Sequence, residues 1–189
     1  MSRLFPTFFV LLATLGQPAL DSGTYSDSTH LYRNHALALS LKVPYGWVDR
    51  TRSMNPDPPD PAKGSVLLAV FERPPEASNS SLDPTILIAA EPVSSYPGLK
   101  TAADYYAPLK EVASAKGLEP AGDPYDFSVG PRKLLRADFT HKTDQGTTYQ
   151  STVVFLVRGN IVSITAIAAS DAAATQLLSG LNFTGPAHP

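Results

Sequence analysis

Hydrophobic residues alternate with small or polar ones in several short runs of this chain. In the run "HALALSLKV" every second residue is a leucine or a valine, and the residues between them are small or polar. This period of two predicts a strand with one buried face. The apolar side of the predicted strand consists of Leu37, Leu39, Leu41 and Val43.

The strand ends at a proline, and the single tryptophan of the chain follows. The segment "VPYGW" fits a β-turn with Pro44 at its second position and Gly46 at its fourth. Trp47 therefore follows a reversal of the chain, where its ring can fold back over the end of the strand. We expect Trp47 to be a structural plug, and the alternative is an exposed aromatic anchor for a partner.

Two further apolar runs, "SVLLAVFE" and "PTILIAAEPV", are rich in β-branched residues and predict neighbouring strands over 66–71 and 85–92. The segment before them, "RTRSMNPDPPDPAKG", carries several prolines and charges and predicts a loop that does not pack. The small and polar residues from Asp21 to Thr29 predict a tether that leads into the domain.

The period changes to that of a helix between Thr101 and Gly117. Thr101 is the predicted N-cap, with Asp104 three residues later as in a capping box, and Gly117 is the predicted stop. Pro108 should kink or split this helix near Ala107. The predicted buried stripe consists of Ala102, Tyr105, Tyr106, Leu109, Val112 and Ala113.

Three strand patterns joined by two tight turns fill the last third of the chain. They are "RKLLRADFT", "TTYQSTVVFLVRG" and "NIVSITAIAA", and the second has apolar residues on both faces, which predicts a central strand covered on two sides. Ser170 is the predicted N-cap of a closing helix over 171–180. This order of elements predicts an α+β fold with an antiparallel sheet.

The same order of segments resembles the PsbP-like domain family. The resemblance rests on "VPYGW" after an alternating strand, on "FSVGPRKLLRADF", on "TTYQSTVVFLVRGNIVSITAIA", and on a capped helix that ends in "LNF". It covers residues 31–183 and implies an α/β/α sandwich, in which helices flank a central antiparallel sheet. Members of the family include extrinsic photosystem subunits, an envelope lipoprotein and a nuclear factor that binds a small GTPase. The resemblance therefore implies a scaffold for binding or assembly, and it brings no catalytic motif with it.

Composition narrows the classes of function. Among the 189 residues, 43% are hydrophobic and 17% are charged, which is enough apolar material for a continuous core. A formal net charge of −2 argues against a nucleic-acid partner, because such proteins usually present a basic face. The absence of cysteine excludes disulfides, thiol catalysis and lipid attachment at a cysteine.

The sequence contains no motif for catalysis, a cofactor or a metal. Its histidines, at positions 30, 35, 141 and 188, lie outside any triad pattern, and Gly-x-Ser-x-Gly, His-Glu-x-x-His and a glycine-rich phosphate loop are all absent. We therefore expect no catalytic, cofactor-binding or metal-binding residues. The expected function is a non-enzymatic binding or assembly module with a protein partner in the cell envelope. The alternative is a small secreted hydrolase whose site is built from residues distant in sequence.

Residues around the proline corner are the predicted contacts with a partner. They are Tyr45, Arg50, Arg52 and Met54. Arg132 and Arg136 share one face of a later predicted strand, and we expect them to be edge charges that prevent unwanted strand pairing. A patch for an acidic partner is the alternative for these two arginines.

The beginning of the chain has the pattern of an export signal. Arg3 precedes an apolar run over residues 4–15, and small residues follow it. The run has about a dozen residues, fewer than the roughly 20 that a membrane-spanning helix needs. We expect a signal peptide over 1–19, a linker over 20–30, one domain over 31–184 and a tail over 185–189. The predicted location is periplasmic or extracellular, with no membrane span after cleavage.

We predict that the exported protein starts between Gln17 and Gly23 and stays in solution without detergent, because the apolar run is too short to anchor it. Intact-mass spectrometry of the exported protein measures its first residue. Retention of residues 1–16 would contradict the prediction.

Overall fold

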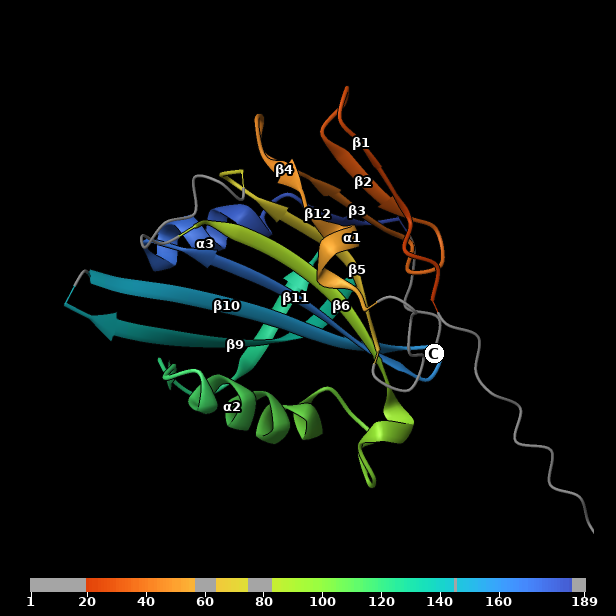
Figure 1. Ribbon diagram of the computed structural model, residues 1–189. Helices are drawn as coiled ribbons and strands as arrows, with labels where there is room; N and C mark the ends of the chain where they lie inside the picture. Colours follow the sequence, from red (N-terminus) through yellow and green to blue (C-terminus); the bar gives the residue numbers. More distant parts are fainter. Residues whose placement is uncertain (1–19, 57–63, 75–82, 145, 185–189) are drawn as a thin grey trace, which may run out of the picture.

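The computed structural model describes residues 20–56, 64–74, 83–144 and 146–184. Within these ranges the chain is mainly antiparallel β-structure in two sheets (Figure 1). The larger sheet has the order β4-β5-β6-β11-β10-β9-β7, and β8 pairs with β9 on the same edge as β7. Its strands are β4 (Val48–Asp49), β5 (Ser65–Phe71), β6 (Thr85–Pro92), β7 (Glu119–Pro120), β8 (Tyr125–Val129), β9 (Arg132–Thr143), β10 (Gly146–Val157) and β11 (Asn160–Ala168).

The smaller sheet brings the two ends of the domain together. Its order is β1-β2-β3-β12, so the last described strand pairs with a strand near the beginning. In this pair Phe183 lies opposite Leu39. The strands are β1 (Thr24–Ser26), β2 (Leu31–Asn34), β3 (Leu39–Lys42) and β12 (Leu181–Phe183).

The segment that was predicted to be a tether is part of the smaller sheet. Strand β1 pairs with β2. The hydroxyl of Tyr32 donates to the carbonyl oxygen of Ser22, and the side-chain amide of Asn34 donates to that of Asp21, each at 2.7 Å. Tyr32 and Asn34 are both buried. The tether prediction was wrong because these later residues hold the segment, and its own polar composition does not show that.

The helices lie on both faces of the larger sheet (Figure 1). Helix α2 packs against one face, while α3 and the smaller sheet cover the other. None of the helices in the described ranges has the length and apolar composition to cross a bilayer. The helical elements are α1 (Thr51–Met54), η3 (Val93–Ser95), η4 (Ala103–Tyr105), α2 (Tyr106–Ala115) and α3 (Asp171–Leu178), where η marks a 3₁₀ turn.

The predicted antiparallel sheet is confirmed, whereas the α/β/α sandwich is present only in part. One flanking layer is helical, but the other is chiefly a second β-sheet with the short helix α3 beside it. The reason is that residues 24–42 and 181–183 form strands, not helices, in this layer. The predicted strands over 66–71 and 85–92 correspond to β5 and β6, which pair with each other as expected.

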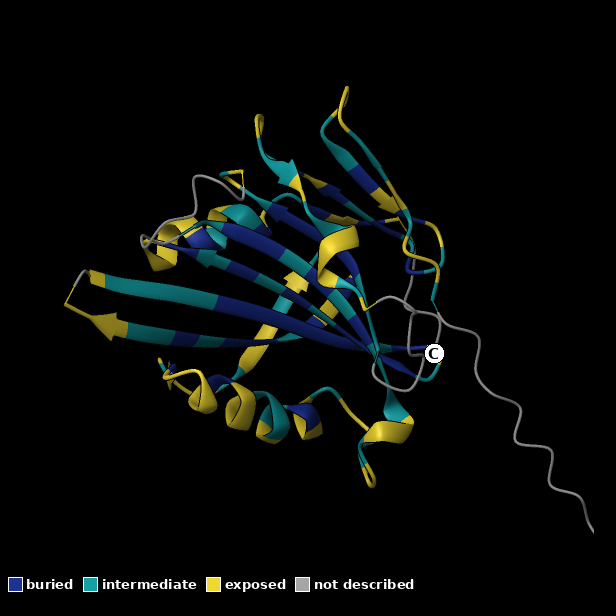
Figure 2. Cartoon of the chain, viewed as in Figure 1, coloured by how far each residue is buried: buried dark blue, intermediate teal, exposed yellow. Residues whose placement is uncertain are grey.

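Strand β10 is buried on both faces, as its sequence predicted. Val153 and Phe155 belong to the main core, between the two sheets. Val154, on the opposite face, packs with Tyr105 and Ile161 below the helical layer. Figure 2 shows the middle of β10 in the buried colour and the end near the β9–β10 hairpin as half-buried or exposed.

The predicted hydrogen bonds between Thr101 and Asp104 are present, but the helical region begins with the 3₁₀ turn η4, whose N-cap position is Ala102 instead of Thr101. A carboxylate oxygen of Asp104 accepts hydrogen bonds from the backbone N–H of Thr101 at 2.8 Å and from its hydroxyl at 2.9 Å. The 3₁₀ turn η4 gives way to α2 at Tyr106, so Pro108 lies in the first turn of the α-helix, where it is tolerated. Val112 was predicted to be buried but is 56% exposed, because only one side of α2 meets the sheet.

Gly117 ends the helical region as predicted, with a φ of +77°. A Cβ atom there would lie 2.8 Å from the ring of His141. The Nδ1–H of His141 donates to the carbonyl oxygen of Gly117 at 2.7 Å, which fixes the ring at the end of α2. This histidine, which lies outside any triad pattern in the sequence, thus has a structural contact.

The segment that was predicted not to pack is attached to β5 over its described part. The side-chain amide of Asn55 pairs with the backbone of Val66 through two hydrogen bonds of 2.9 and 2.8 Å. The hydroxyl of Thr51 accepts from the backbone N–H of Ala69 at 2.9 Å. Residues 57–63 of this segment lie outside the described ranges. The polar side chains that suggested a loop thus act as substitutes for strand pairing.

Glu91 connects the end of β6 to the helical layer. Its carboxylate accepts hydrogen bonds from the hydroxyl groups of Tyr96 and, at 2.7 Å, of Tyr105. Burial of the ring is the largest cause that raises the pKa of Tyr96, to about 12, and the hydrogen bond and charge of Glu91 add to it. The pKa of Tyr105 is raised by the same causes.

We predict that the free energy of unfolding falls as the pH rises from about 10 to about 12. In this window the tyrosines of the unfolded chain lose protons, while Tyr96 and Tyr105 keep theirs in the folded protein, so rising pH favours the unfolded state. Urea unfolding at a series of pH values measures the slope. Tyr96→Phe should reduce the slope. Equal slopes in the variant and the unaltered protein would contradict the prediction.

Candidate functional site

Two hollows flank the first turn of α3, at the end of the larger sheet where the β9–β10 hairpin extends. The hydroxyl of Ser170 accepts a hydrogen bond from the backbone N–H of Ala173 at 3.1 Å, so the predicted N-cap of α3 is confirmed. Helix α3 therefore starts shortly after the end of β11. Asp171 lines the hollow on one side, and Ala173 and Leu177 line the hollow on the other. We call these hollows the polar pocket and the Trp47 groove.

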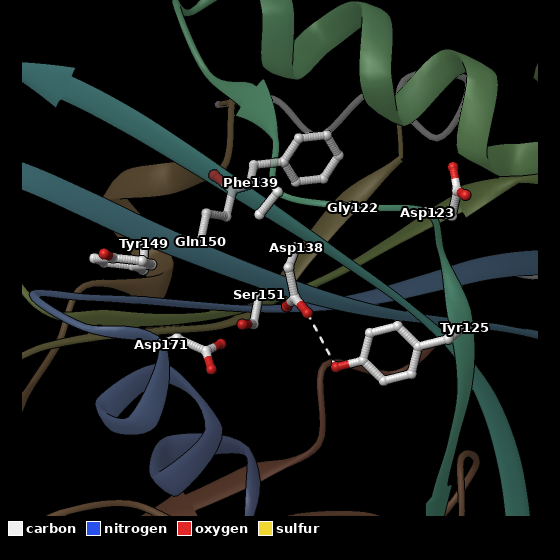
Figure 3. Close-up of a pocket in the computed structure, with 10 residues that line it drawn as sticks. Gly122, Asp123, Tyr125, Asp138, Phe139, Tyr149, Gln150, Ser151 and Asp171 are labelled. Carbon is white, nitrogen blue, oxygen red and sulfur yellow. Dashed lines mark hydrogen bonds between the residues drawn. The ribbon is translucent and has the colours of Figure 1, made fainter.

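The polar pocket encloses about 220 Å³. Figure 3 shows the side chains of Tyr125 and Asp138 directed toward each other across it, and the tyrosine hydroxyl donates to the carboxylate at 3.0 Å. Burial is the largest cause that raises the pKa of Tyr125, and the hydrogen bond to Asp138 adds to it. The pocket is lined by Ala121, Gly122, Asp123, Tyr125, Asp138, Phe139, Tyr149, Gln150, Ser151 and Asp171.

Arg136 holds the walls of the polar pocket together. Its side chain is almost completely buried, and its Nε donates to Asp138 at 2.8 Å. One terminal nitrogen lies 3.2 Å from a carboxylate oxygen of Asp171, and within 3.0 Å of the hydroxyl groups of Ser151 and Thr175. This guanidinium therefore connects β9, β10 and α3. The prediction that Arg136 is an edge charge that prevents strand pairing was wrong, because β8 pairs with β9 at this position and α3 brings an acidic partner.

Arg136 engages the polar side chains of the pocket. Ser151 accepts a hydrogen bond from the guanidinium of Arg136, and no histidine is among the described residues that line the pocket. The carboxylates of Asp138 and Asp171 are both paired with Arg136. Among the residues that the structure describes, no group of three or more potential ligands is placed to hold a metal ion. The arrangement can position α3 and present polar groups to a ligand.

The Trp47 groove is larger, with a volume of about 880 Å³. Ala168, Ala169 and Ala173 leave room along it because their side chains are short. Trp47 and Leu177 supply large apolar surfaces. The lining residues are Trp47, Glu72, Arg73, Pro84, Thr143, Gly146, Thr147, Thr148, Ala168, Ala169, Ala173, Gln176 and Leu177. The sequence did not reveal this groove, because its lining comes from five separate parts of the chain.

Trp47 combines the two roles that its sequence position left open. Its ring is half-buried and packs against the main core, as expected of a plug, yet it also lines the groove. The chain reverses at Tyr45 and Gly46, and the φ of +82° at Gly46 fits the third position of a type II turn. The turn is thus one residue later than predicted.

The predicted partner contacts differ in their exposure. Tyr45 is 88% exposed, with its ring edge-on to that of His30 at 5.0 Å, and Met54 is 47% exposed. Arg52 is exposed on α1. These three, together with Arg50, stay predicted contacts, and none of the four lines the Trp47 groove or the polar pocket.

Arg50 has a structural role that its sequence position did not show. Its guanidinium forms an ion pair with Asp83 at 3.2 Å and donates to the carbonyl oxygen of Arg73. It also lies over the ring of Phe71, 4.2 Å from the ring centre. Arg50 therefore connects the end of β4 to the end of β5 and to the residue before Pro84, beside the groove.

Comparisons with known proteins support the fold. No family model matches the sequence, and no curated protein matches it. The solved structure of cyanobacterial PsbP from Synechocystis sp. PCC 6803 is similar, with a TM-score of 0.53 and 14% identity over 92% of this chain and 99% of that chain. LpqN of Mycobacterium tuberculosis, described as involved in cell envelope biogenesis, has a TM-score of 0.43 and 16% identity over 78% of this chain and 83% of its own. PA94 of Pseudomonas aeruginosa, of unknown function, has a TM-score of 0.43 and 18% identity over 84% of this chain and 96% of that chain. The resemblance drawn from the sequence is thereby confirmed at the level of the fold: the chain has a PsbP-like fold.

Proposed function

We propose that the chain is an exported, non-catalytic binding module of the cell envelope, which holds an apolar segment of a protein partner in the Trp47 groove. The groove is the observation that carries this proposal. Its volume of about 880 Å³ lies within the roughly 300–1,000 Å³ that is usual for ligand sites. A half-buried tryptophan at its wall is the residue type that most often dominates the energy of protein interfaces.

The lining of the groove favours an apolar segment with a polar backbone. Trp47, Pro84 and Leu177 offer apolar contact, and the short alanine side chains leave space for a side chain of the partner. The hydroxyl groups of Thr147 and Thr148 and the amide of Gln176 can hydrogen-bond to a peptide backbone. An apolar centre with a polar rim is the usual composition of a protein interface.

Export is supported by the first residues of the chain. The charged start and the short apolar run over residues 4–15 are typical of a signal peptide. The PsbP-like fold is compatible with a scaffold for binding or assembly, which is what the family resemblance implies. These two observations together support a location in the periplasm or outside the cell, with a partner in the envelope.

We predict that a large side chain at Ala173 blocks the groove, whereas the same change at its neighbour Ala172 does not. Both alanines are exposed on α3, but only Ala173 lines the groove. The mature chain is used to capture partners from an envelope extract of the source organism, and the captured proteins are measured by quantitative mass spectrometry. Ala173→Phe should weaken capture by about tenfold or more, equivalent to ~1.4 kcal/mol, and Ala172→Phe should leave it unchanged. Equal capture by the two variants would rule out the groove as the binding site.

We also predict that Trp47→Ala lowers the free energy of unfolding by about 2 kcal/mol, less than the roughly 3–5 kcal/mol for a fully buried aromatic residue. The reason is that one side of the ring packs on the core and the other lines the groove. As the single tryptophan, Trp47 also reports on the groove by fluorescence, and iodide should quench it partly. A partner that fills the groove should reduce this quenching. Complete quenching together with unchanged stability of the variant would show that the ring does not pack.

A further inference from the structure

Two buried arginines on one strand differ in the partners of their charged groups. Arg132 and Arg136 lie four residues apart on β9, so their side chains point to the same face of the sheet. Both are almost completely buried, with 5% and 3% of their surface exposed. Arg136 has four oxygen partners. Arg132 has no ion pair and no hydrogen bond from its side chain to any residue that the structure describes.

Aromatic rings are the main surroundings of the Arg132 guanidinium. Its central carbon lies 4.6 Å from the centre of the Phe183 ring and 5.4 Å from that of Phe155. The two rings meet edge to face, 5.4 Å apart. Contact with ring faces attracts a cation but leaves its charge unneutralised and its N–H groups without acceptors. Burial accordingly lowers the pKa of Arg132.

The end of the guanidinium is less buried than its Nε. Nε is fully buried and has no acceptor within the described ranges. The two terminal nitrogens also have no acceptor there, and they are less completely buried than Nε. Arg132 thus has two terminal NH₂ groups without an acceptor, next to the rings of Phe155 and Phe183. A buried charge without a counter-charge is costly, and each such group in a native protein calls for an explanation.

We propose that the terminal nitrogens of Arg132 bind an oxyanion, a carboxylate or a phosphate group. The two rings lie near the guanidinium carbon but offer no oxygen or nitrogen acceptor, so the N–H groups of the terminal nitrogens are the part left for a ligand. Two parallel N–H groups match two oxygens of an oxyanion, which makes such pairs both strong and selective. Arg132 lines neither the Trp47 groove nor the polar pocket, so this site is independent of the proposed function.

Titration of the full mature chain with acetate and with phosphate tests the site. Both are added at constant ionic strength held with sodium chloride, and two quantities are followed: the NMR resonance of the Arg132 Nε–H and Tm. We expect a saturable shift of the resonance and a rise in Tm of several degrees with at least one of the two oxyanions, since a ligand that binds only the folded state stabilises it. Shifts that grow linearly without saturation would overturn the proposal.

Matched variants separate binding at Arg132 from general salt effects. Arg132→Met keeps an apolar side chain against the two rings and should abolish the rise in Tm. Arg33→Met removes an exposed arginine on β2 and should leave the rise unchanged. An identical response of Arg132→Met and the unaltered chain would overturn the site.

Discussion

Strand β10 buries side chains on both of its faces, and a layer of structure must therefore cover each of them. On one face Val153 and Phe155 need apolar partners, and the smaller sheet supplies them by bringing β12 back beside β3. On the other face Val154 meets Tyr105 at the start of the helical layer. The return of the chain end to the beginning of the domain is thus a consequence of the composition of a single strand. A chain with a one-sided β10 would need only one of these layers.

The hollows at the candidate site exist because this cover is incomplete at one end of the sheet. Strand β10 changes from half-buried to buried near Ser151, and the hairpin beyond it extends past the smaller sheet. Helix α3 is short and covers only the middle of this region. Arg136 fixes its position through Asp171 and Thr175. Helix α3 separates the two hollows, so its attachment to Arg136 determines where a ligand can enter.

The sequence predicted those features whose causes lie within a few residues. The strands β6, β9, β10 and β11 follow from local periodicity, and the hydrogen bonds at Thr101 and the cap at Ser170 follow from side chains that bond to the next turn. Features that depend on distant partners were missed. Strand β1 is held by Tyr32 and Asn34, and the packing of Asn55 depends on Val66, which the local composition cannot show. The groove was missed for the same reason, since its residues converge only in the folded chain.

The two arginines of β9 show why a strand pattern alone cannot tell a structural charge from a binding one. By sequence they are equivalent, since both lie on one face of the same strand among apolar residues. The difference comes from what the opposite layer provides. At Arg136 that layer is α3, whose first turn carries Asp171, so the charge is neutralised within the protein. At Arg132 it is β12, whose Phe183 provides an aromatic face and no carboxylate. The charge of Arg136 is therefore balanced within the protein, whereas the charge of Arg132 is left for an external anion, although both are arginines on the same strand.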